Sequence, residues 1–84
     1  MTQEDREIWR GAFDLYENNH AMPNNMLSWQ AFLRAVCAFA DRYDWKNCPL
    51  AHFLADAVIF ACEAEVKERE SRQLTLEDLE VPPL

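Results

Sequence analysis

Cys48, His52 and Asp56 recur at intervals of four residues in the stretch CPLAHFLAD, residues 48–56. On a helix, this spacing puts Cys48 and His52 on one face, where a thiolate and an imidazole could both bind a metal ion. Zinc needs three or four such ligands, and Cys62 lies about 20 Å further along the same helix. His20 could join only from a loop. We therefore predict no metal site and no cofactor.

The same helix face could support acid–base chemistry, because His52, Asp56 and Glu63 share one stripe. A cysteine near a helix N-terminus, such as Cys48, can also have a lowered pKa. However, the polar faces of helices consist of such residues by default, and no residue completes a nucleophilic pair with Cys48. The chain also lacks a Gly-rich phosphate loop, a nucleophile elbow, a CxxC motif and EF-hand spacing. We predict no catalytic residue and no enzymatic activity.

Composition favours one small helical domain. The chain has 84 residues, of which half are hydrophobic, with a single glycine and four prolines. So little glycine leaves few of the turns that an all-β fold requires. The net charge of −7, with eight basic residues scattered among fifteen acidic ones, argues against direct binding of nucleic acid or of anionic membranes. An acidic N-terminus without an apolar leader, and three cysteines that cannot all pair, predict a cytoplasmic protein.

Hydrophobic spacing predicts an all-α fold, a small three-helix bundle with helices at about 2–18, 27–43 and 49–71. Thr2 and Asp5 resemble a capping box, and Asn25 or Ser28 can cap the second helix. Gly11, in the middle of the first helix, predicts close approach of another helix. A short helical turn at about 75–80 and an extended Pro-Pro end should follow, docking on the bundle or on a partner.

The third predicted helix carries more apolar surface than two neighbours can cover. Its polar stripe is narrow and contains His52, Asp56, Glu63, Lys67 and Glu70. Its apolar stretch is too short, and too interrupted by charge, to span a membrane. Beyond residue 63 the helix is charged on all sides, so we expect a solvated end with the pairs Glu65–Arg69 and Glu68–Arg72. Cys37 and Cys62 are interpreted as small core residues.

This surplus predicts self-association as a twofold dimer, with Ile59 or Phe60 at the interface. The alternative is that the C-terminal segment covers the helix within one chain. Trp9, Trp29 and Trp45 could line a pocket between helices, although tryptophans are more often core residues. Trp45 is the aromatic residue that we expect to be the most exposed, and an exposed aromatic can anchor a partner.

No family motif is matched, and the leading hypothesis is a non-enzymatic protein–protein interaction module. Apolar anchors would supply affinity, and the acidic field would select a partner with a basic surface. The candidate interface residues are Trp45, His52, Asp56, Ile59 and Phe60. Two alternatives remain open. The chain could be an acidic inhibitor that mimics nucleic acid, as phage or mobile-element proteins can, or a helical domain that senses a small ligand.

Overall fold

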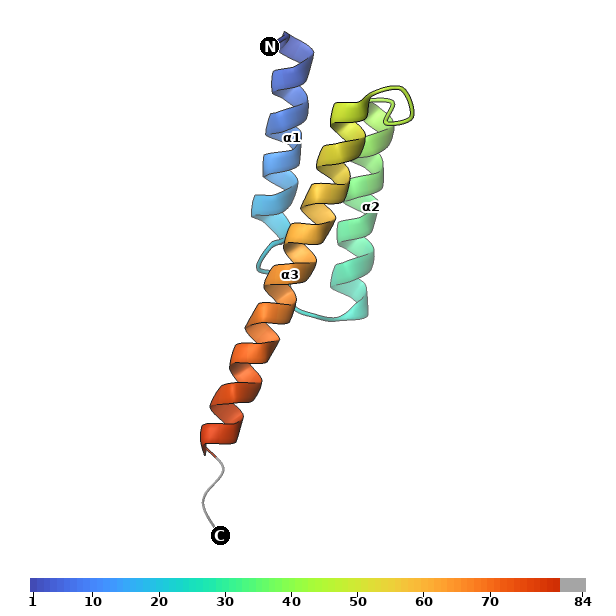
Figure 1. Ribbon diagram of the computed structural model, residues 1–84. Coiled ribbons are helices and arrows are strands. Elements are labelled where there is room, and N and C mark those ends of the chain that lie inside the picture. Colours follow the sequence, from blue (N-terminus) through green and yellow to red (C-terminus); the bar gives the residue numbers. More distant parts are fainter. Residues whose placement is uncertain (81–84) are drawn as a thin grey trace.

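The computed structural model describes the backbone of residues 1–80 and the side chains of residues 1–72. Three helices make up the fold: α1 (Gln3–Asn19), α2 (Met26–Arg42) and α3 (Pro49–Glu80). Neighbours in sequence run antiparallel, so α1 and α3 point in the same direction and α2 in the opposite one (Figure 1). The predicted all-α three-helix bundle is confirmed, and no strand occurs in residues 1–80.

The starts of the first two helices follow from local capping. The Thr2 hydroxyl accepts a hydrogen bond from the Asp5 backbone N–H at 3.1 Å, while the Asp5 carboxylate accepts from the Thr2 N–H at 3.4 Å. This reciprocal arrangement is the predicted capping box. At α2, the Asn25 side chain accepts a hydrogen bond from the Ser28 N–H at 2.8 Å, which selects Asn25 over Ser28 as the cap.

A left-handed residue ends α2 and directs the chain into α3. Asp44 has a φ of 52°, a conformation that glycine usually supplies after a helix. The N–H groups of Asp44 and Trp45 donate to the carbonyls of Asp41 and Ala40, at 3.3 and 3.0 Å. These two bonds form a Schellman motif, which fixes the position of Trp45 at the start of α3.

The third helix is longer than the spacing of its hydrophobic residues predicted. It does not end at residue 71, with a separate turn at 75–80, but continues without interruption to Glu80. No glycine or proline lies between residues 50 and 81, so nothing in the sequence breaks the helix before the proline pair. The last part of α3 extends beyond the connection between α1 and α2 (Figure 1). The predicted docking of the C-terminal segment concerns side chains and a Pro-Pro end that lie outside the described residues.

The core forms where α3 packs against both other helices. Its buried side chains come from all three helices and from the α1–α2 connection: Ile8, Ala12, Met22, Phe32, Val36, Phe39, Ala51, Leu54, Ala55, Val58, Cys62 and Val66. Cys62 is fully buried, as predicted, whereas the prediction that Cys37 belongs to the core is wrong, because this residue is exposed on α2. The helical period placed Cys37 beside the apolar stripe, but α3 covers only the side of α2 that carries Val36.

Gly11 lies where α1 packs closely against α2, as the sequence predicted. A Cβ atom at this position would lie 2.9 Å from Cε2 of Phe39, whose ring is itself buried and packs edge-to-face on Tyr43. That distance is shorter than any normal carbon–carbon contact. Glycine is therefore required here by packing, although it weakens the helix.

We expect Gly11→Ala to lower the free energy of unfolding by about 1 kcal/mol, measured by urea denaturation. Overpacking against Phe39 costs about 1–3 kcal/mol, and the better helix propensity of alanine returns about 1 kcal/mol. In a Phe39→Leu background the ring edge is absent, so the same change should become neutral or stabilising. An equal loss in both backgrounds would show that contact with Phe39 is not the cause.

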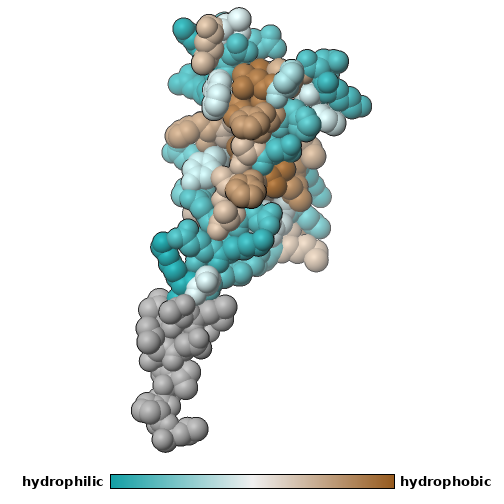
Figure 2. Space-filling view, viewed as in Figure 1, coloured by the Kyte–Doolittle hydropathy of each residue, from teal (hydrophilic) through white to brown (hydrophobic). Residues whose placement is uncertain are grey.

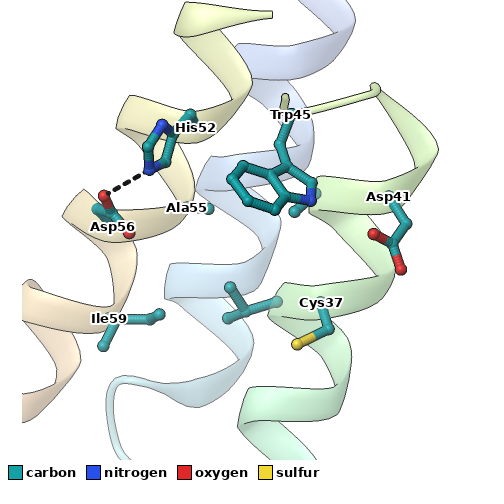
Figure 3. A pocket seen from close by; sticks show the side chains of 9 residues that line it. Cys37, Asp41, Trp45, His52, Ala55, Asp56 and Ile59 are labelled. Atoms are coloured by element: carbon teal, nitrogen blue, oxygen red, sulfur yellow. Dashed lines mark ion pairs between the residues drawn. The ribbon is translucent and has the colours of Figure 1, made fainter. Parts of the chain in front are cut away.

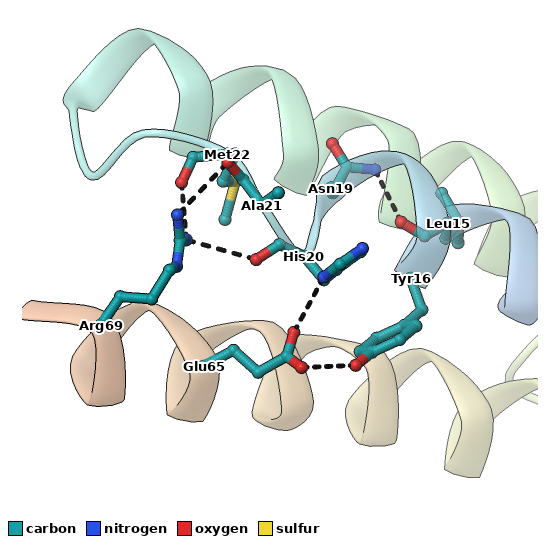
Figure 4. Close-up of polar contacts among 8 residues, drawn as sticks. All are labelled: Leu15, Tyr16, Asn19, His20, Ala21, Met22, Glu65 and Arg69. Atoms are coloured by element: carbon teal, nitrogen blue, oxygen red, sulfur yellow. Dashed lines mark hydrogen bonds and ion pairs between the residues drawn. The ribbon is translucent and has the colours of Figure 1, made fainter.

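Charged side chains of α3 hold the α1–α2 connection (Figure 4). The Arg69 guanidinium donates hydrogen bonds to three consecutive backbone carbonyls, those of His20, Ala21 and Met22, at 3.2, 3.3 and 2.8 Å. One turn earlier, Glu65 accepts a hydrogen bond of 2.6 Å from the Tyr16 hydroxyl, and its second oxygen lies 3.3 Å from Nδ1 of His20. We call Glu65 and Arg69 the clasp.

The clasp corrects the prediction that α3 is simply solvated beyond residue 63. The predicted pair Glu68–Arg72 does form on the exposed side of the helix. Glu65 and Arg69, by contrast, each bind the α1–α2 connection, and no ion pair joins these two side chains in the structure as described. The physical reason is that the carbonyls of His20, Ala21 and Met22 lie beyond the end of α1 and lack helical partners, so they accept hydrogen bonds from the Arg69 guanidinium.

The hydrogen bond to Glu65 raises the pKa of Tyr16, and partial burial and the charge of Glu65 act in the same direction. Because the folded state holds this proton more tightly than the unfolded chain, the stabilisation is complete below pH 10. It is lost as the pH rises through the pKa of the folded state. We expect the melting temperature of the wild type to fall more steeply above pH 10 than that of Tyr16→Phe. Parallel curves would contradict the assignment.

Candidate functional site

Four of the five predicted interface residues line one groove between α2 and α3. Trp45, His52, Asp56 and Ile59 all face this groove, which has a volume of about 440 Å³ (Figure 3). Val36 and Ala40 of α2 and Ala55 of α3 complete its apolar floor. We call this cavity the α2–α3 groove.

The rims of the α2–α3 groove are acidic. Asp41 stands on the α2 side and Asp56 on the α3 side. The Asp56 carboxylate lies 3.2 Å from Nε2 of His52, and both side chains are largely exposed. The Trp45 ring meets the His52 ring edge-on, with 5.3 Å between centroids. The groove thus combines an apolar floor, an aromatic end and a carboxylate on each side.

Trp45 is less exposed than the sequence suggested. It is half-buried, because the Schellman motif and the His52 ring hold its indole against the bundle, and three phenylalanines are more exposed. The idea of one pocket lined by all three tryptophans is wrong as well. Trp9 lies beside α3, while Trp29 packs on Phe32.

Phe60, the fifth candidate, does not line this groove but lies one turn after Asp56, at the edge of an exposed aromatic surface. Trp9 and Phe13 of α1 and Phe53 and Phe60 of α3 are 47%, 61%, 66% and 75% exposed. A shallow groove of about 220 Å³ between α1 and α3 contains Trp9, Phe13 and Ala57. Ala57 follows Phe53 by four residues and precedes Phe60 by three, so these two phenylalanines flank the groove on one helix face. We call the four aromatic residues the aromatic face.

In the view of Figure 2, in which α1 and α3 both face the reader, apolar residues gather over the first half of α3. The sequence identified Phe60 here, but it placed Trp9 either in a pocket between helices or in the core, and it did not single out Phe13. A helical wheel could not separate Trp9 and Phe13 from the core, because each directly follows a buried residue, Ile8 or Ala12. The spacing of Trp9 and Phe13 could have indicated that they share a surface. They lie four residues apart, as His52 and Asp56 do, so each pair lies along one edge of its helix.

The thiols offer little chemistry. Burial raises the pKa of the Cys62 thiol, and the charge of Glu65 adds to the effect, which disfavours the reactive thiolate. Cys48 is partly buried and packs against the core. Within the described part of the chain, no three histidine, cysteine or acidic residues are close enough to hold a metal ion. None of the described helices is long and apolar enough to cross a membrane.

Comparisons of the chain with protein families, with curated proteins and with solved structures found no significant match.

Proposed function

We propose that this chain is a non-enzymatic interaction module that forms a twofold homodimer through its aromatic face. The observation that carries the proposal is the exposure of four aromatic side chains on one surface of two parallel helices. Tryptophan and phenylalanine at the centre of a surface are typical anchors of protein interfaces. The parallel course of α1 and α3 places these anchors side by side, so one partner surface can cover all of them.

The size of the aromatic face suits a dimer. An aromatic side chain offers about 150–250 Å² of surface, so the exposed fractions leave roughly 500 Å² on each protomer. Two copies would bury about 1,000 Å² from these side chains alone, which is the lower limit for a specific interface. A twofold axis lets the same face serve both protomers, so no second surface is needed.

Charge sets the conditions under which the dimer forms. Each protomer carries a net charge of −7, so the two copies repel each other at low ionic strength. Salt screens this repulsion and leaves apolar burial unaffected. The dimer should therefore tighten as salt rises, whereas contacts between the acidic surface and a basic partner should weaken.

A partner protein with a basic surface and a cytoplasmic location complete the proposed role. The acidic charge favours encounter with basic surfaces and disfavours nucleic acid. Cysteines 37, 48 and 62 are free thiols, and such thiols persist in the reducing cytoplasm.

Sedimentation velocity over a range of protein concentrations, at low and moderate salt, tests the dimer. We expect a reversible monomer–dimer equilibrium in the micromolar range that shifts to dimer as salt is added. A monomer at every concentration and salt level would overturn the proposal, and so would a dimer that salt dissociates.

A further inference from the structure

We propose that the α2–α3 groove binds a basic amphipathic helix of a partner protein, with apolar side chains on the floor and a lysine or arginine against each acidic rim. This inference rests on the proposed role as an interaction module, but it does not depend on the dimer. The residues that line the α2–α3 groove differ from those that line the groove of the aromatic face, so the two surfaces can be occupied together.

The shape of the groove suits a helix. It lies between two antiparallel helices, and its volume of about 440 Å³ falls in the usual range of about 300–1,000 Å³ for ligand cavities. Its floor is made of small and branched apolar residues, Val36, Ala40, Ala55 and Ile59. Helix-in-groove recognition uses apolar anchors on one helix face, and such a floor accepts them without a buried polar group losing its hydrogen bonds.

The rim charges select a cation. Asp41 has no side-chain partner in the described part of the chain, and Asp56 contacts only the His52 ring. No lysine or arginine lines the groove. Basic side chains along a docked helix would meet Asp41 on one rim and Asp56 on the other, and the desolvation of these charges would be compensated by charge-assisted hydrogen bonds.

Trp45 provides a further feature that favours a cation. Its ring already lies near one, because Nζ of Lys46 is 5.9 Å from the ring centroid. Indole is the best of the aromatic faces for such contacts. A second copy of the chain, by contrast, would bring additional negative charge to the two carboxylates, so the groove is unsuited to self-association.

A library of random peptides of about 16 residues, long enough to form a helix, provides the probe. Peptides displayed on phage are selected against the wild-type protein, and the affinity of recovered peptides is measured by fluorescence anisotropy. We expect recovered sequences to combine lysine or arginine with leucine or aromatic residues at helical spacing. Their affinity should fall at least tenfold in Asp41→Asn/Asp56→Asn.

The matched control is Asp14→Asn/Glu17→Gln, which changes two exposed acids of α1. Each double variant moves the net charge from −7 to −5, so only the location of the charge differs. Peptides that lose affinity equally in both variants would show a diffuse electrostatic effect and overturn the groove. A library that yields no peptide sensitive to the Asp41 and Asp56 changes would overturn it too. Repeating the measurement on Phe13→Glu separates the two proposals. This residue of the aromatic face is on α1 and does not line the α2–α3 groove, so loss of the dimer should leave peptide affinity unchanged.

Discussion

Phe60→Glu is expected to raise the dissociation constant of the dimer at least about 100-fold, as measured by sedimentation equilibrium. In the isolated protomer this side chain is exposed, so glutamate should fold equally well there. At the dimer interface the change removes an aromatic anchor, commonly worth about 2 kcal/mol or more, and buries a carboxylate without a partner. A factor of 100 corresponds to about 2.7 kcal/mol, which these two effects together exceed.

Leu27→Glu is the matched control for this prediction. Leu27 is 79% exposed in the first turn of α2, away from the aromatic face, and the substitution introduces the same charge in place of an apolar side chain. It should leave the dimer nearly as tight as that of the wild type. If both variants dissociate equally, added charge alone explains the effect and the aromatic face is not the interface.

Arg69→Ala is expected to lower the free energy of unfolding by about 2 kcal/mol. The guanidinium donates to three carbonyls at the end of α1, and hydrogen bonds to charged groups contribute about 1.5–3 kcal/mol each when they are well shielded. Only the bond to Met22 is partly buried. In the variant, the exposed carbonyls of His20 and Ala21 can form hydrogen bonds with water instead. The loss should therefore correspond to about one strong bond, measured by urea denaturation at fixed protein concentration.

Arg72→Ala provides the comparison for the clasp. Arg72 lies one turn further along α3 and, among the described residues, pairs with Glu68 on an exposed side of the helix. Exposed pairs of this kind contribute about 0.2–0.5 kcal/mol. A loss from Arg69→Ala that is no larger than the loss from Arg72→Ala would mean that the carbonyl contacts do not stabilise the connection.

Much of the fold could be predicted because its determinants are local. Thr2 and Asp5 form their capping box within one turn, and Asn25 caps α2 through a neighbour three residues away. Gly11 stands out because glycine is otherwise absent, which made close helix packing the natural interpretation. The end of α3 was predicted too early, because Thr75 and Asp78 resemble the cap of a separate turn, although no helix-breaking residue lies between residues 50 and 81.

The candidate site was predicted in part, and the failures share a cause. Trp45, His52, Asp56 and Ile59 meet in one groove because the helical wheel of α3 alone puts three of them together. The exposure of Cys37, Trp9 and Phe13 depends instead on where a neighbouring helix stops covering them. Spacing along one helix reveals which residues share a face but not which faces find a neighbour. Glu65 and Arg69 were paired with each other for the same reason.

The clasp also affects the order of events during protein synthesis. The residues that hold the α1–α2 connection follow it in sequence by 47–49 positions. At translation rates of about 5–20 residues per second, the α1–α2 connection is synthesised seconds before Arg69 is added to the chain. A nascent chain stalled ahead of residue 65 would carry both helices without their closing contacts. Mature tertiary structure should therefore appear only after the second half of α3 has emerged.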